Sequence, residues 1–179
     1  MNKNTLISLL ESKGFAQINY EAWSIGSPWA NTTEIGFLKN NLFYLAHTIC
    51  DSGVMIEFHA EMANLCEEDV DNVLNKFKKQ EPYYIRFNEP KRKVSLSEFY
   101  AELNERGFWI NYPNEANAKM DGFTLLVNTK LTEAGLGWSV KLRNEALIIE
   151  KTLGYDYLSL YNFRKVVKEL KHRAEIWKR

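Results

Sequence analysis

Cysteine is nearly absent: the 179 residues contain only Cys50 and Cys66. Two thiols cannot supply the disulfide framework of a small secreted domain. We expect both to be buried free thiols in a reducing compartment, because unpaired cysteine packs as a small apolar side chain. The cysteine content therefore favours a cytoplasmic protein.

Long hydrophobic runs are also missing. No apolar run approaches the roughly 20 residues that a membrane-spanning helix needs. The first residues, MNKNTLISLLESKGF, lack the apolar centre of a signal peptide. We therefore expect no membrane span.

The chain carries no excess of charge, because 23 Lys and Arg residues balance 23 Asp and Glu residues. A field of one sign over the whole protein would steer nucleic acid toward it or imitate nucleic acid. Neither is expected here, so nucleic acid is an unlikely partner.

Recognisable catalytic motifs are absent as well: there is no Gly-rich phosphate loop, GxSxG or HExxH. His47 and Cys50 have a spacing that hints at metal binding, but residues three apart on a strand point to opposite faces. We predict no metal and no cofactor. Glu57 and His59 are two apart and share a face, so they could do acid–base chemistry in a cleft. A polar pair on the solvent side of a sheet is the favoured interpretation.

Aromatic residues, by contrast, are abundant at 13%, and the core is centred on the stretch from Leu42 to Phe58. This stretch reads as two apolar strands joined by Asp51-Ser52-Gly53, where glycine allows a tight turn. Neither face of the first strand is clearly polar, which predicts a strand inside a sheet and not at its edge.

The remaining periodicity predicts short helices and strands. Helices are expected over 5–13, 67–79, 95–107 and from 160 onward. Asn4 is the expected cap of the first helix, and Gly14 its stop. Strands are expected over 15–20, 83–87, 108–112, 122–130, 138–142 and 146–149. Loops are expected over 21–40 and 113–122, with a linker over 88–93.

This order states one pattern twice, with Gly14-Phe15 and Gly107-Phe108 in matching places. We predict an α+β fold of antiparallel sheets with flanking helices, built as two pseudo-repeated α-β-β-β-α halves packed together. The halves are 1–92 and 93–179, which could form one compact domain. A chance likeness between the halves is the alternative. A monomer and a homodimer are both compatible with the sequence.

The α-β-β-β-α order is similar to that of double-stranded-RNA-binding domains. Those domains carry a basic cluster at the start of their second helix, where this chain has Glu67, Glu68 and Asp69, so this relationship is rejected. In topology the order also resembles the α+β units of type III secretion chaperones. That resemblance implies a role in binding other proteins, although fold alone does not define a function.

Candidate binding residues lie in three places. Arg164, Lys168 and Lys171 follow helical spacing and form a basic stripe, for which the alternative is a solvated face. Trp23 and Trp29 lie in the expected loop, either as plugs on the core or as interface anchors. Tyr83, Tyr84 and Arg86 lie on a possible edge strand and have the residue types of interface anchors.

Together these observations predict a small cytoplasmic protein-binding module, such as an immunity protein, an inhibitor or a chaperone-like adaptor. An enzyme is the less favoured alternative, with a site around Glu57 and His59. Nucleic-acid binding through the last helix is a third possibility, for which no known module accompanies the basic stripe.

Overall fold

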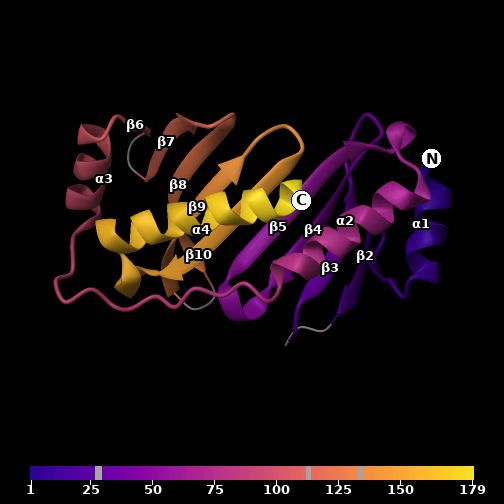
Figure 1. Cartoon of the computed structure of the whole chain (residues 1–179), viewed down its shortest axis with the longest axis horizontal. Helices are drawn as coiled ribbons and strands as arrows, with labels where there is room; N and C mark the ends of the chain where they lie inside the picture. Colours follow the sequence, from indigo (N-terminus) through magenta and orange to yellow (C-terminus); the bar gives the residue numbers. More distant parts are fainter. Residues whose placement is uncertain (27–29, 112–113, 133–134) are drawn as a thin grey trace. The chain divides into compact units, whose positions relative to one another are not determined.

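The computed structural model describes residues 1–26, 30–111, 114–132 and 135–179. The chain forms two compact units (Figure 1). Unit 1 comprises Met1–Tyr83 and Glu145–Leu147, and unit 2 comprises Tyr84–Asn144 and Ile148–Arg179. Each unit is described by itself below.

The described residues of unit 1 form two helices and five strands. Its elements are α1 (Lys3–Ser12), β1 (Ala16–Asn19), β2 (Ala22–Gly26), β3 (Thr32–Phe37), β4 (Leu42–Ile49), β5 (Val54–Glu61) and α2 (Glu67–Gln80). Short 3-10 turns, Cys50–Ser52 and Met62–Asn64, follow β4 and β5. The strands are ordered β1-β2-β3-β4-β5, and each neighbouring pair is antiparallel.

Unit 2 has the same element order. It contains α3 (Leu96–Glu105), β6 (Trp109–Asn111), β7 (Glu115–Met120), β8 (Phe123–Thr132), β9 (Gly135–Arg143), β10 (Leu147–Gly154), a 3-10 turn (Tyr155–Tyr157) and α4 (Leu160–Lys178). Its strands are ordered β6-β7-β8-β9-β10 and are likewise antiparallel. The predicted α+β class, with antiparallel sheets and flanking helices, is confirmed. None of the helices in the described residues is long and apolar enough to cross a bilayer.

The central hairpin forms as predicted. β4 lies between β3 and β5, so its backbone is paired on both sides. Gly53 ends the turn with φ 60° and ψ 35°, a left-handed conformation that costs glycine little. Phe43, Leu45 and His47 are all buried on one face of β4. This face packs against α2, as the stacking of His47 on Phe77 shows.

The helix ends follow local chemistry, with one correction. Gly14 and Gly107 follow their helices with φ of 96° and 90°, as expected for glycine stops. The cap of α1 is Asn2, whose side chain accepts a hydrogen bond from the Thr5 backbone at 2.9 Å, and not Asn4. The helix therefore begins two residues before the predicted start, because the first turn continues back to the next residue able to cap it.

Two predicted loops and one predicted strand are wrong. Residues 21–40 contain β2 and β3, and residues 113–122 contain β7, although composition indicated loops. These strands persist because each pairs with a neighbouring strand, and pairing overrides weak local preference. Conversely, residues 83–87 form no strand. The backbone of 84–88 instead contacts α4, where Lys165 donates to the Arg86 carbonyl and Asn162 to the Asn88 carbonyl.

Cys50 and Cys66 are free, but both are exposed, which corrects the prediction of buried thiols. Cys50 directly follows β4 at the start of a 3-10 turn, and Cys66 lies between the Met62–Asn64 turn and α2. Cys66 is the N-cap of α2, and its backbone N–H donates to Asp69 at 2.8 Å. Turn and cap positions project from the sheet, which is why these side chains escape burial.

Candidate functional sites

The last helix presents basic side chains to solvent. Arg164, Lys168 and Lys171 are exposed on α4, while its opposite side buries Phe163 and Val166 against unit 2. Lys171 lies 3.4 Å from Asp121 in an exposed ion pair. Among the described residues, Arg164 and Lys168 have no such ion pair, so their charges remain available to a partner.

The chain segment 84–88 lies along this helix. Nζ of Lys165 donates to the Arg86 carbonyl at 2.5 Å, and Nδ2 of Asn162 donates to the Asn88 carbonyl at 2.9 Å. The Lys165 ammonium also lies 5.1 Å from the centre of the Phe87 ring. Figure 1 shows the segment passing beneath α4. These contacts order a stretch that has no regular secondary structure.

Two exposed tyrosines flank the same contacts. Tyr84 is 60% exposed and Tyr161 is 70% exposed, which is unusual for large aromatic residues. The Lys165 ammonium lies 5.8 Å from the Tyr161 ring centre. We use the name cationic tyrosine surface for the residues of segment 84–88 and α4 that share this region: Tyr84, Arg86, Tyr161, Arg164, Lys165 and Lys168. The sequence indicated the stretch around Tyr84 and Arg86 and the basic stripe of the last helix as separate candidates, and the structure brings them together.

The other candidate binding residues lie elsewhere. Trp23 belongs to β2 and not to a loop; it is only 6% exposed, and its Nε1 donates to Glu11 at 3.1 Å. Its ring packs edge-on against Phe37, so it is part of the unit 1 core, as the plug interpretation expects. Trp29 lies outside the described residues. Tyr83 is half-buried and is the last residue of the first segment of unit 1.

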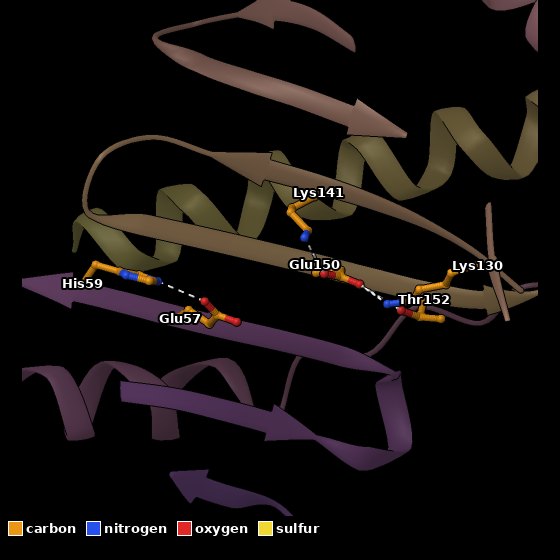
Figure 2. Close-up of polar contacts among 6 residues, drawn as sticks. All are labelled: Glu57, His59, Lys130, Lys141, Glu150 and Thr152. Carbon is orange, nitrogen blue, oxygen red and sulfur yellow. Dashed lines mark hydrogen bonds and ion pairs between the residues drawn. The ribbon is translucent and has the colours of Figure 1, made fainter. Parts of the chain in front are cut away.

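Glu57 and His59 form a polar pair on β5. Nε2 of His59 lies 2.9 Å from Oε2 of Glu57, and the side chains are 26% and 22% exposed (Figure 2). The His59 ring also stacks on Tyr44. Both residues lie on the sheet face opposite the one that α2 covers, because they alternate with Ile56 and Phe58 along the strand. Neither lines the cavities found in the described part of the chain near Met1, His47 and Lys171.

A different carboxylate cluster lies on β10 in unit 2. Glu150 has a side chain only 7% exposed; it contacts Lys130 and lies 3.2 Å from Nζ of Lys141 (Figure 2). Burial would raise the pKa of Glu150, but the two ammonium groups outweigh that effect and lower it. The cluster is a satisfied ion-pair network and holds a carboxylate anion within the sheet.

A buried charge cluster joins α4 to β10, and the sequence analysis missed it. Glu169 and Arg173 are completely buried, and Lys151 is 3% exposed. Oε2 of Glu169 lies 3.4 Å from Nζ of Lys151, and the two helix side chains pair at 3.0 Å. Burial lowers the pKa of Lys151, although the charge of Glu169 opposes that effect. Strand alternation could have revealed Lys151, because it shares a face with Ile149 and Leu153.

Unit 1 contains a cavity of about 510 Å³ between α2, the end of α1 and the sheet. Its apolar lining consists of Phe15, Ile25, Leu74 and Phe77. Its charged lining consists of Lys13, Asp71, Lys78 and Glu81. The volume falls in the range of small-molecule sites, which is roughly 300–1,000 Å³.

His47 lies at this cavity and is only 4% exposed. Its Nδ1 is 2.8 Å from the Thr33 hydroxyl, and its ring stacks on Phe77 with centres 5.1 Å apart. Its Nε2 is 3.0 Å from Oε1 of Glu81, yet the two atoms make no aligned hydrogen bond. Burial lowers the pKa of His47, and the nearby Glu81 carboxylate only partly opposes this. The imidazole is therefore neutral at pH 7.

Comparisons with known proteins place no constraint on these sites. No family model matches the chain, and no characterised protein or solved structure is significantly similar to it.

Proposed function

We propose that this chain is a protein-binding module that uses the cationic tyrosine surface of unit 2 to hold an acidic segment of another protein. The observation that carries the proposal is the contact of Lys165 with the Arg86 backbone, which places an exposed arginine beside the basic face of α4. Arginine and tyrosine are among the side chains that most often dominate the energy of protein interfaces.

The charge distribution supports a protein partner. Arg164 and Lys168 are exposed cations on a chain whose total charge is zero. A surface of this kind attracts a local acidic segment, while the balanced remainder provides no general attraction for the phosphate backbone. Tyr84 and Tyr161 add apolar contact area with a polar tip, which suits a partner side chain.

Several finer expectations belong to the same proposal. A cytoplasmic inhibitor, immunity protein or chaperone-like adaptor would need only such a surface and no catalytic group. The shared order α-β-β-β-β-β-α in the two units favours an internal duplication, in which one copy kept or gained the binding surface. Glu57 and His59 carry the alternative of an enzyme, and their place outside the described cavities weighs against it.

The test is affinity capture from host lysate treated with nuclease, using the tagged chain and the double variant Arg164→Glu/Lys168→Glu. We expect one stoichiometric protein with the original chain and its loss with the variant, because two favourable charge contacts become repulsive. The matched control is Lys39→Glu/Lys79→Glu, which reverses two exposed lysines of unit 1. It should capture the partner as the unaltered chain does.

Two outcomes would oppose the proposal. Equal capture by both double variants would show that the surface is not used. Binding of RNA or DNA in a low-salt gel shift, lost in the Arg164→Glu/Lys168→Glu variant, would assign the surface to nucleic acid instead.

A further inference from the structure

The cavity of unit 1 is notable because polar side chains occupy core positions that unit 2 fills with leucine. In unit 1, His47 pairs with Thr33 on one side and with Ile56 on the other. In unit 2, Leu142 pairs with Leu125 on one side and with Ile149 on the other. β4 and β9 are both the fourth strand of their unit, and the partners Ile56 and Ile149 are each the third residue of the fifth strand. The two sets therefore occupy corresponding places in the same topology.

The fold therefore does not require a histidine or threonine at these positions. Leu125 and Leu142 are at most 2% exposed, and the cavity beside Leu142 measures only about 250 Å³. Burying a polar side chain costs free energy unless it is fully hydrogen-bonded. Unit 1 nevertheless buries His47, whose Nε2 atom lacks an aligned hydrogen-bond partner. The cavity beside His47 is also larger than the cavity beside Leu142. Such an arrangement fits a site that a ligand completes.

The charges of the cavity favour a cation. Lys13 lies 2.6 Å from Asp71, so these two charges offset each other. Glu81 lies against a neutral imidazole, because burial lowers the pKa of His47. When the ring proton is on Nδ1, Nε2 is a bare acceptor next to a carboxylate. Lys78 also lines the cavity, but it is exposed, whereas Nε2 of His47 is buried and Glu81 is one-third exposed.

We propose that this cavity binds a small primary amine with an aromatic or branched apolar body. Its ammonium group would donate to both Nε2 of His47 and the Glu81 carboxylate, as a group with three N–H donors can. The apolar body would lie against Phe15, Ile25 and Leu74, which line the cavity. This site belongs to unit 1 and is independent of the cationic tyrosine surface.

The test uses 2-phenylethylamine, with 2-phenylethanol and 3-phenylpropionate as neutral and anionic analogues of similar shape. Titrations at pH 7 follow the NMR signals of the His47 ring and give each Kd. We expect a saturable shift with the amine and binding at least about tenfold weaker for the alcohol and the acid, since a charge-assisted hydrogen bond is lost.

Two variants distinguish specific binding of the amine at His47 and Glu81 from nonspecific hydrophobic binding. Glu81→Gln should weaken amine binding about tenfold while leaving the alcohol unchanged, because it removes only the negative charge. His47→Leu, which places the side chain of Leu142 at the corresponding position, should abolish the preference for the amine. Lys79→Gln, on the exposed side of α2, is the control and should behave as the unaltered chain.

The proposal is overturned if the amine produces no saturable shift, or if the alcohol binds as tightly as the amine. It is equally overturned if Glu81→Gln, with an unchanged melting temperature, binds the amine normally. Because Glu81 is one-third exposed at the end of α2, its variant is expected to fold even if His47→Leu does not.

Discussion

Arg173 follows Glu169 by one turn of α4, and both side chains are completely buried, with Nε of the arginine 3.0 Å from Oε1 of the glutamate. Nζ of Lys151 approaches the other carboxylate oxygen at 3.4 Å. One carboxylate therefore lies between two buried cations. Removing it would leave two like charges in a low-dielectric environment.

We expect Glu169→Gln to lower the free energy of unfolding by about 3–5 kcal/mol, the usual cost of breaking a buried ion pair. Urea denaturation measures the change. Glu175→Gln is the matched control on the same helix, because Glu175 and Lys178 form a pair that is about 60% exposed. That variant should change stability by less than about 1 kcal/mol. Similar effects of the two variants would contradict the burial of Glu169.

The lowered pKa of His47 predicts a pH dependence of stability. The folded protein keeps the imidazole neutral below its ordinary pKa of 6.5, whereas the unfolded chain becomes protonated there. The unfolded state then binds more protons, so stability must fall as the pH decreases from 6.5 toward the lowered pKa. Thermal unfolding at a series of pH values should show this loss, and His47→Leu should reduce it. If the stability of His47→Leu falls with decreasing pH as steeply as that of the original chain, the loss comes from carboxylates and not from His47.

Glu57 and Glu150 occupy corresponding positions of β5 and β10 but have different surroundings (Figure 2). Glu150→Gln leaves Lys130 and Lys141 without their shared carboxylate and should cost about 1–3 kcal/mol. Glu57→Gln, at a half-exposed pair, should cost less than about 1 kcal/mol. Chemical denaturation of the two variants compares them directly, and a larger cost at Glu57 would refute this ranking.

Gly36 leaves room for the ring of its cross-strand neighbour Tyr44. A Cβ atom at this position would overlap the tyrosine ring, so Gly36→Ala should destabilise the protein by about 1–3 kcal/mol through overpacking. In a double-mutant cycle, Tyr44→Ala should remove most of this penalty. Additive effects of the two substitutions would show that the ring does not occupy this space.

Local sequence chemistry predicted much of the fold. Gly14 and Gly107 end helices because glycine adopts positive φ freely, and the Ser95 side chain caps α3 by accepting a hydrogen bond from the Glu98 backbone N–H. The hairpin around Gly53 and the apolar stripe of α4 follow from the same short-range patterns. Such features depend on residues within one or two turns of each other, so they can be read before any tertiary contact is known.

Other features were decided only by packing between distant segments. Trp23 was ambiguous in the sequence because only pairing of β2 with β3 and contact with α1 show that it is buried. Residues 83–87 looked like a strand, but they form none, and Lys165 of α4 donates to the Arg86 carbonyl.

The sequence by itself determined the α+β class, the helix stops at Gly14 and Gly107, the central hairpin and the basic face of α4. The tertiary structure alone decided that His47 meets Glu81 at a cavity and that Glu169 lies between Lys151 and Arg173. Periodicity indicates which side chains share a face of a helix or strand. The charged groups that pack against that face belong to another part of the chain, so periodicity does not reveal them. Burial of charge is therefore a property of the packed units and not of either segment.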